Sequence, residues 1–422
     1  MGARRFDVLV VGAGPAGSTA ALVLARAGAR VALLDKARFP RDKACGDLIG
    51  PRALQVLADL AVPEPVGVDV ANLVVVGPSS RRVVLTCIDG IAYPGRGRVV
   101  TRHVFDHALR AAALDAGAVP VEGRADHPLR SNGDLDGFTV DGGDALHADF
   151  VIGADGATSR VAQVAALVDV PRVLWGFAVR CYVDQHVDHP VIALWEQARW
   201  QAFPGYGWIF PAPGGGANLG VGIGTLGDRR GGAGAVRALP DFLDHLVHLG
   251  LLDRATARPV PRQLGGWLKM GMVGTRPAAG RVLLVGDAAG LVNPLQGEGI
   301  AQAMTSGRAA AEAVLGSPGR AAAQYGRALV RSHLPYQRIA AAGHAALVGR
   351  PRAVSAVGRI LTAPGIGRAL ADGWGVFWNE LLVGAAPGSA RTVAAATTWL
   401  GRGVTGASGV ARWFDTLADD AD

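Results

Sequence analysis

The chain has 422 residues, a formal net charge of +7 and an apolar fraction of 50%, which is enough sequence for two or three domains with a substantial core. The basic balance suits an anionic partner, but the arginines are spread along the chain without an aromatic-interleaved basic block, so we expect no nucleic-acid partner. Only three cysteines occur, which excludes a disulfide framework and favours a reducing compartment.

The N-terminus has basic residues followed by an apolar run, as a secretory signal does, but that run holds a glycine fingerprint with no role in export. The longest uncharged stretch, residues 200–227, is interrupted throughout by Gly and Pro and cannot form a spanning helix. We therefore expect a cytoplasmic protein, with peripheral contact at the inner face of the membrane as a further option. Residues 351–382 mix arginine with apolar and Trp residues and could make that contact, although a packed helix pair explains them better.

The first elements are predicted from FDVLVVGAGPAGSTAALVLARAGARVALLDK, which has the pattern strand, glycine turn, helix, strand. The apolar run Val8–Val11 is typical of a strand buried on both faces of a parallel sheet. Gly12, Gly14 and Gly17 would supply the turn, the close approach of the backbone to a pyrophosphate, and helix–strand packing. Asp35 ends the second strand, where an acid binds a ribose hydroxyl. This unit predicts a dinucleotide site.

The next predicted elements are a helix capped by Thr101 that reaches about Ala116 and a buried strand within 148–161 that ends at Asp155-Gly156. Several strands are expected in 172–224, followed by a helix at 235–249. A strand, a glycine loop and a long helix are expected at 281–315, and further helices from about residue 320. A second glycine pattern, Gly222 to Gly227, is not followed by an apolar helix. We expect a loop between strands there and no second nucleotide site.

Three motifs in order resemble the fingerprint of FAD-dependent oxidoreductases with the para-hydroxybenzoate hydroxylase fold: GAGPAG at 12–17, GADGATSR at 153–160 and LVGDAAGLVNPLQGEGI at 284–300. The resemblance implies non-covalent FAD, with Asp287 bound to a ribityl hydroxyl and Asp155-Gly156 between the pyrophosphate and the route of NAD(P)H. It implies that the helix after Gly297 points its N-terminus at the isoalloxazine, which would stabilise negative charge there. Arg102 resembles an FAD-contacting arginine, and a solvated helix arginine is the alternative.

Within that fold, FPRDKACGD (39–47), GYGWIFP (205–211) and NPLQGEGI (293–300) resemble the geranylgeranyl reductase family. The resemblance implies that reduced flavin N5 delivers hydride to carbon–carbon double bonds of a polyprenyl substrate: a prenyl diphosphate, a prenylated quinone or an isoprenoid lipid. It implies a pocket lined by Tyr206, Trp208, Phe210 and Pro211. At strand spacing the three aromatic residues share one face and form a wall.

Reduction of an isolated alkene by hydride also requires a proton donor. The resemblance places Cys45 close to the isoalloxazine, which makes its thiol one candidate. Lys43 and Arg41 are expected to lower the thiol pKa, which would favour the thiolate instead. Tyr206 is a second candidate, either as donor or as a gate to the pocket, and Cys45 as a merely small residue beside the flavin is the plain alternative.

The residues expected to bind the cofactor are Gly12, Gly14, Pro15, Ala16, Gly17, Asp35, Lys36, Arg41, Ala44, Cys45, Gly46, Arg102, Asp155, Gly156, Gly286, Asp287, Gly297, Glu298, Gly299 and Ile300. NADPH, NADH or another electron donor would act transiently as the reductant. Cys87 and Cys181 are expected in the core. The ten histidines show no ligand spacing, so we expect no metal.

We therefore expect an α/β fold, α+β overall. Its FAD-binding, Rossmann-like domain is assembled from residues 1–70, 98–165 and 275–335; a strand-rich substrate domain comprises 71–97 and 166–274, and a helical region 336–422. The alternative function is an FAD-dependent monooxygenase that hydroxylates or epoxidises a lipophilic metabolite. A non-catalytic prenyl carrier fits less well, because the flavin motifs are intact, and a halogenase is disfavoured because no lysine lies between Lys43 and Lys269. The sequence leaves the oligomeric state open.

Overall fold

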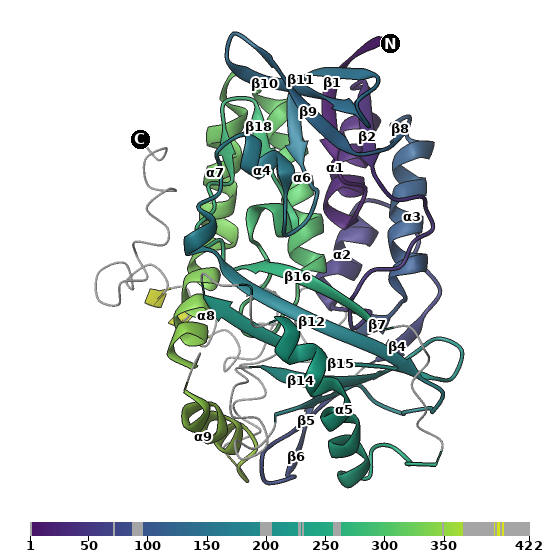
Figure 1. The fold of residues 1–422 in the computed structure, drawn as a ribbon, viewed down its shortest axis with the longest axis vertical. Coiled ribbons are helices and arrows are strands. Elements are labelled where there is room, and N and C mark those ends of the chain that lie inside the picture. Colours follow the sequence, from purple (N-terminus) through teal and green to yellow (C-terminus); the bar gives the residue numbers. More distant parts are fainter. Residues whose placement is uncertain are drawn as a thin grey trace.

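The computed structural model describes residues 2–70, 72–86, 96–194, 205–226, 229, 232–255, 263–347, 350–365, 392, 395, 396, 399 and 400. Cys87 and the whole segment 366–391 lie outside these residues. The described part has two large sheets, one above the other in Figure 1, with helices packed beside the upper sheet and α5 (Gly232–His248) beneath the lower one.

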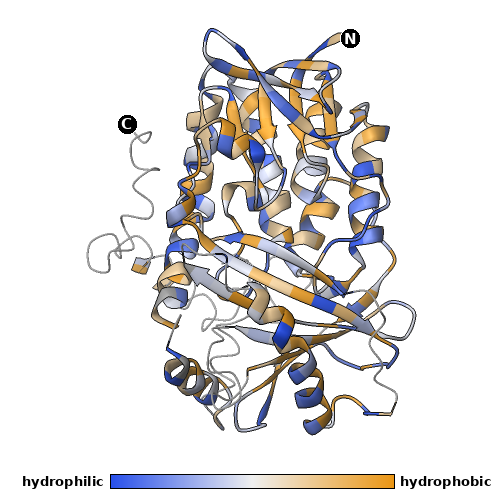
Figure 2. Cartoon of the chain, in the orientation of Figure 1, coloured by the Kyte–Doolittle hydropathy of each residue, from blue (hydrophilic) through white to orange (hydrophobic). Residues whose placement is uncertain are grey.

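The upper sheet has the order β17-β18-β11-β1-β2-β8, with β10 paired to β11 and β9 to β10. Its strands are β1 (Ala3–Val11), β2 (Val31–Asp35), β8 (Val119–Glu122), β9 (Ala125–Ser131), β10 (Asp134–Val140), β11 (Ala145–Gly153), β17 (Ala278–Ala279) and β18 (Val282–Leu284). The four central pairings, from β18 to β8, are parallel. Figure 2 shows apolar residues concentrated in these strands, as expected for a sheet buried on both faces.

The helices beside this sheet are α1 (Pro15–Arg26), α2 (Pro51–Asp59), α3 (Arg102–Asp115), α4 (Arg160–Val164), α6 (Ile300–Gly316) and α7 (Ala321–Ser332). Helix α1 contacts both α3 and α6. The sheet and helices enclose the largest core. Helix α1 follows β1 through the glycine turn, and α6 follows β18 through η2 and a loop, so that their N-termini lie at one edge of the sheet, near the second sheet (Figure 1).

The lower sheet has the order β16-β12-β15-β14-β13-β5-β6. Its strands are β5 (Asn72–Val76), β6 (Arg82–Thr86), β12 (Leu174–Val183), β13 (Val191–Ala193), β14 (Tyr206–Pro211), β15 (Ala217–Leu226) and β16 (Leu264–Met270). One face packs against α5 through a core that includes Ile209. The opposite face carries Trp208 and Phe210 in a separate cluster. The alternation along β14 therefore places the predicted aromatic wall on the face away from α5, as strand geometry requires.

The remaining elements are a small sheet of β3 (Leu48–Ile49), β7 (Gly97–Val99) and β4 (Val68–Val70), the short helices η1 (Val170–Arg172), η2 (Gly286–Ala289) and η3 (Pro318–Arg320), and the C-terminal helices α8 (Leu334–Leu347) and α9 (Pro351–Leu361). The predicted mixed α/β class is confirmed, with its helical C-terminal region. The predicted helix at 235–249 corresponds to α5, and the strand, loop and helix at 281–315 to β18, η2 and α6.

Two local expectations need correction. The loop predicted from Gly222 is wrong, because β15 continues to Leu226 and pairs with β12 along its whole length. Its glycines instead admit large neighbours: a Cβ at Gly220 would lie 2.3 Å from Trp208 Cζ2, and one at Gly224 would lie 1.9 Å from His344 Cε1. Thr101 stands at the N-cap of α3 as predicted, but its side chain makes no capping hydrogen bond.

Candidate functional site

The glycine turn between β1 and α1 is closed by contacts that leave no room for side chains. Gly12 has a φ of +106°, and a Cβ there would lie 2.2 Å from Ala154 O. A Cβ on Gly17 would lie 1.8 Å from Gly12 O, so the helix starts directly on the turn. Gly14 differs, since its nearest neighbour would be Arg41 Nη2 at 3.7 Å. The side of Gly14 is therefore the open side, where a ligand can approach the backbone.

Asp35 supports this turn from the end of β2. Its carboxylate accepts hydrogen bonds from Ala13 N at 2.7 Å and from Ala37 N at 2.8 Å. A carboxylate has about four acceptor positions, so two remain for an external hydroxyl. The neighbouring Lys36 is exposed.

The other two glycine motifs converge on the same turn. A Cβ on Gly286 would lie 3.1 Å from Ala16 Cβ, and the Cβ of a residue at Gly12 would lie 2.9 Å from Asp155 N. Asp155 accepts hydrogen bonds from Ser159 Oγ and from the backbone at the start of α4, so its carboxylate also caps that short helix.

The end of the site nearest the lower sheet is formed by η2 and the start of α6. Lys43 Nζ lies 3.7 Å from Asp287 Oδ2, and a Cβ on Gly299 would lie 3.7 Å from Asp287 Oδ1. Ala301 N donates to Glu298 Oε1 at 3.0 Å. The sequence motifs around residues 43, 287 and 299 are thus brought together.

These residues fit FAD. Helices α1 and α6 both begin at a glycine N-cap and have no acidic residue in the first turn. In α6, Ala301 N already donates to Glu298 Oε1, whereas the N-cap of α1 supplies no side-chain bond. Their N-termini can therefore accept anionic or electron-rich groups of a ligand. In the loop before α6, the side chain of Gln296 presents a buried Nε2 without a hydrogen-bond partner among the described residues. A cofactor that is anionic in its middle and rich in acceptors at one end suits this donor set.

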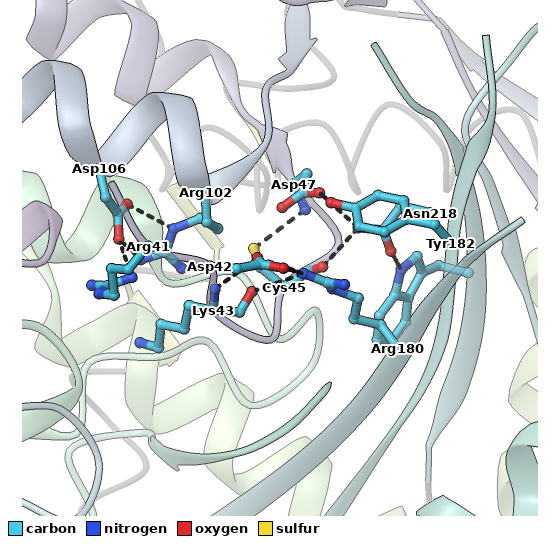
Figure 3. Close-up of polar contacts among 11 residues, drawn as sticks. Arg41, Asp42, Lys43, Cys45, Asp47, Arg102, Asp106, Arg180, Tyr182 and Asn218 are labelled. Carbon is cyan, nitrogen blue, oxygen red and sulfur yellow. Dashed lines mark hydrogen bonds and ion pairs between the residues drawn. The ribbon is translucent and has the colours of Figure 1, made fainter. Parts of the chain in front are cut away.

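Cys45 lies in the loop before β3, and Arg102 faces its thiol from the start of α3 (Figure 3). Burial raises the thiol pKa above its ordinary value of 9.0, and the Arg102 guanidinium opposes that rise without cancelling it. The expectation that Lys43 and Arg41 lower this pKa is wrong. Arg41 is held by Asp106 at 2.8 Å and Lys43 by Asp287, so both charges are already paired. The thiol is therefore protonated at neutral pH.

Arg102 is 4% exposed, so the alternative of a solvated helix arginine is also wrong. It forms a bidentate pair with Asp106, with Nε–Oδ1 and Nη2–Oδ2 distances of 2.7 Å and 2.8 Å. Asp106 is fully buried and also pairs with Arg41. The Asp106 carboxylate thus orients both Arg102 of α3 and Arg41 of the loop before β3.

A second polar network holds the Cys45 segment against the lower sheet (Figure 3). Asp47 N donates to Cys45 Sγ at 3.3 Å, and Asp47 has a φ of +64°, a conformation that Asp tolerates better than most residues. Its carboxylate accepts hydrogen bonds from Tyr182 of β12 and from Asn218 of β15. Burial raises the pKa of Asp47, and those two hydrogen bonds oppose the rise.

Asn218 and Arg180 extend this network. The Asn218 amide also donates to Cys45 O at 2.9 Å. Arg180, which is 1% exposed, donates to both carboxylate oxygens of Asp42, at 2.5 and 2.6 Å. Residues near both ends of the RDKACGD segment, Asp42 and Asp47, therefore bind side chains of the lower sheet, and these bonds fix the position of the thiol.

The aromatic wall lies directly against this segment. The ring centroids of Tyr206 and Trp208 are 6.3 Å apart, and those of Trp208 and Phe210 are 6.4 Å apart. A Cβ on Gly46 would lie 2.8 Å from Phe210 Cε2 and 3.2 Å from Trp208 Nε1, so only glycine allows the thiol segment to pass so closely. Pro211 is buried at the end of the same strand.

Tyr206 closes the wall at the end nearest α6. Its hydroxyl donates to the backbone carbonyl of Gln296, and a Cβ on Gly297 would lie 3.0 Å from its oxygen. Burial raises the pKa of Tyr206, with Cys45 and Glu298 adding to the rise. The proton of this hydroxyl is therefore directed to a backbone carbonyl and away from the space beside Cys45.

Several residues of this region were not predicted from the sequence: Asp42, Asp47, Asp106, Arg180, Tyr182 and Asn218. Two carried a recognisable signal. Asp106 stands four residues after Arg102 on a helix, the spacing of an ion pair, and Asn218 is a lone amide in an otherwise apolar, glycine-rich strand. Cys181, by contrast, lies in the core as predicted. Among the described residues no group of three His, Cys, Asp or Glu side chains could hold a metal ion. Every helix in the described ranges is too short or too polar to cross a membrane.

Comparison with known proteins identifies this arrangement. Residues 5–172 match the family model described as "FAD binding domain". The chain is 35% identical to menaquinone reductase of Mycolicibacterium smegmatis over 316 residues, which cover 73% of this chain and 76% of the relative. It is 35% identical to digeranylgeranylglycerophospholipid reductase 2 of Methanopyrus kandleri over 315 residues, 73% of this chain and 76% of the relative. The chain belongs to the geranylgeranyl reductase family of FAD-dependent oxidoreductases.

The fold agrees with this assignment. A crystal structure of a geranylgeranyl bacteriochlorophyll reductase-like protein from Thermoplasma acidophilum matches with a TM-score of 0.64 and 22% identity, covering 99% of this chain and 100% of that one. The protein is thus an FAD-dependent reductase of this family, and its FAD-binding domain includes the glycine turn, Cys45 and Arg102.

Proposed function

We propose that this member of the geranylgeranyl reductase family saturates carbon–carbon double bonds in the isoprenoid chain of a lipophilic substrate. A prenylated quinone is our first choice, because the Mycolicibacterium relative is named a menaquinone reductase; prenyl diphosphates and isoprenoid lipids are the other classes. The observation that carries the proposal is the contact of Gly46 with Trp208 and Phe210, which puts a protonated thiol beside an apolar aromatic wall. FAD, once reduced, supplies a hydride from N5.

In this proposal Cys45 is the proton donor. One alkene carbon takes the hydride and the other takes the thiol proton, so the double bond becomes a single bond with two new C–H bonds, and the thiolate regains a proton from water. Arg102 faces the sulfur and stabilises the thiolate in the interval. Tyr206, with its hydroxyl directed to Gln296 O, is proposed as the inner wall of the pocket rather than the acid.

We further propose that FAD is held non-covalently by the three converging glycine motifs. Asp35 would bind ribose, the N-terminus of α1 the diphosphate, and Asp287 the ribityl chain, with α6 aimed at the isoalloxazine. The upper sheet with its helices would form the cofactor domain and the lower sheet the substrate domain, as divided above. NADPH or NADH would reduce FAD transiently. Peripheral contact with a membrane would give access to a lipid-soluble substrate.

The test is an anaerobic half-reaction. The purified yellow protein is photoreduced without oxygen and mixed with menaquinone, and in a parallel sample with geranylgeranyl diphosphate, while flavin absorbance is followed. We expect reoxidation by one of the substrates, together with a product that is still heavier by two hydrogen atoms after air has returned any quinol to the quinone. A product that instead gains an oxygen atom, and only after air is admitted, would establish the monooxygenase alternative and overturn the proposal.

A further inference from the structure

Lys269 is a buried lysine that lies outside the three glycine motifs and outside the segments 39–47 and 205–211. It is the penultimate residue of β16 and is 1% exposed. The end of β16 is tied to the segment that follows Asp287, because Gly271 N donates to Val292 O at 3.0 Å and Met272 N to Gly290 O. A Cβ on Gly290 would lie 3.5 Å from Lys269 Cγ, so the lysine stem runs along this segment.

No hydrogen bond or ion pair of Lys269 is found among the described residues. Its ammonium nitrogen is also absent from their fully buried polar atoms that lack a partner, so the nitrogen keeps some accessible surface although the residue is 1% exposed. Other deeply buried cations of the site are paired: Arg102 with Asp106 and Arg180 with Asp42. An uncompensated buried ammonium is expensive, typically several kcal/mol. Burial accordingly lowers the pKa of Lys269 to about 8, while the more distant carboxylates of Asp155 and Asp287 oppose that shift.

The surroundings of Lys269 belong to the cofactor site. Asp155 abuts the glycine turn at Gly12, and Asp287 abuts the segment before α6 at Gly299. The stem of Lys269 lies beside Gly290, which directly follows η2, so the lysine stands at the end of the cofactor site that η2 and the start of α6 form. The described residues supply no contacting anion there, and FAD is the anionic molecule named by the family model that matches residues 5–172.

We propose that Lys269 is an FAD-binding residue whose ammonium contacts an anionic group of the cofactor between Asp155 and Asp287. The inference rests on FAD binding and not on the proposed isoprenoid substrate, so it survives if that substrate is wrong. Two groups of FAD offer the required negative charge. The diphosphate carries it in both redox states, whereas the isoalloxazine acquires it on reduction.

The diphosphate contact and the isoalloxazine contact predict different results for Lys269→Met, a substitution that removes the charge and keeps most of the volume. A diphosphate contact predicts FAD binding weakened at least tenfold in the oxidised state, with the midpoint potential unchanged. An isoalloxazine contact predicts a midpoint potential lowered by about 30 mV or more, the shift equivalent to a tenfold loss of preference for reduced flavin in a two-electron couple. Fluorescence titration of the apoprotein gives the first quantity and dye equilibration under anaerobic conditions gives the second.

Two further variants make the test specific. Lys269→Arg keeps the charge and should retain at least part of the affinity and potential. Arg320→Met removes an exposed charge and should change neither. Thermal unfolding adds a readout without FAD: the Lys269→Met apoprotein should be at least as stable as the wild-type apoprotein, and FAD should stabilise it less.

Wild-type affinity and potential in folded Lys269→Met would overturn the proposal. If that variant does not fold, Lys269→Gln, which keeps a neutral polar tip, replaces it in the same comparison. Failure of both to fold would show that the chain needs the ammonium without FAD, which also overturns the proposal.

Discussion

The indole N–H of Trp208 donates a 3.1 Å hydrogen bond to the side-chain oxygen of Asn218. The amide nitrogen of the same Asn218 donates to the backbone oxygen of Cys45 and to the carboxylate of Asp47. One buried amide therefore joins the aromatic wall of the lower sheet to the thiol segment of the FAD-binding domain. The distance between wall and thiol is set by this side chain rather than by loop packing alone, so we expect Asn218 to be a positioning residue.

Replacement of Asn218 by Ala removes these three hydrogen bonds and leaves Asp47 and the Trp208 indole underpaired. We expect the free energy of unfolding to fall by about 1–3 kcal/mol, the usual penalty for a stranded buried polar group. Trp208→Phe removes the indole N–H but keeps an aromatic ring. In a double-mutant cycle measured by urea denaturation, the two changes should couple by roughly 0.5 kcal/mol or more. Strict additivity would show that the hydrogen bond between Trp208 and Asn218 contributes nothing to the free energy of unfolding.

Two glycines of β15 offer a matched pair for testing how tightly Trp208 is seated. A Cβ at Gly220 would lie 2.3 Å from Trp208 Cζ2 and 2.4 Å from Val179 O, whereas one at Gly222 would only touch Trp208 Cζ3 at 3.9 Å. Gly220→Ala should therefore destabilise the protein by about 1–3 kcal/mol through overpacking, and Gly222→Ala should be tolerated. Thermal unfolding of both variants checks this, and equal effects would contradict the assigned packing of the indole.

The sequence predicted the parts of this site that depend on local pattern. The glycine turn, the strand ending at Asp35 and the alternation of Tyr206, Trp208 and Phe210 each follow from neighbouring residues. The network around Asp47 could not be predicted in this way, because Tyr182 and Asn218 reach it across 135 and 171 residues of chain. The same limit explains the error at Cys45: nearby basic residues were visible in the sequence, but their pairing with Asp106 and Asp287 was not.

The ion pairs of Asp106 provide a prediction about stability. This carboxylate is fully buried between Arg102 and Arg41. Asp106→Asn keeps the shape but leaves two guanidinium groups without a counter-charge, and such a loss typically amounts to about 3–5 kcal/mol. Asp59→Asn removes the exposed partner of Arg308 and should cost at most about 1 kcal/mol. Chemical denaturation of both apoproteins gives the comparison, and an Asp106 variant as stable as the Asp59 variant would refute the charge argument.

The proposed acid role of Cys45 predicts a specific kinetic defect. Cys45→Ala should leave reduction of FAD by NADPH near its wild-type rate but slow anaerobic reoxidation by the isoprenoid substrate by about 10²-fold or more, the lower range for loss of a general acid. Cys181→Ala, in the core on the other face of the sheet, should leave that step unchanged. A Cys45 variant that reoxidises at the wild-type rate would remove the thiol from the mechanism.

The pH dependence of the same step follows from the raised pKa of Cys45. A thiol must hold its proton to donate it, and burial raises this pKa above 9.0. The wild-type rate should therefore be level between pH 6 and pH 9, as far as this group is concerned, and fall only at higher pH, where the thiol ionises. In Cys45→Ser the hydroxyl does not ionise in this range, so the alkaline fall should disappear from an already slow rate. Stopped-flow reoxidation from pH 6 to well above pH 9 measures both profiles. A wild-type rate that rises as the pH increases through 9 would instead assign activity to the thiolate and exclude Cys45 as the acid.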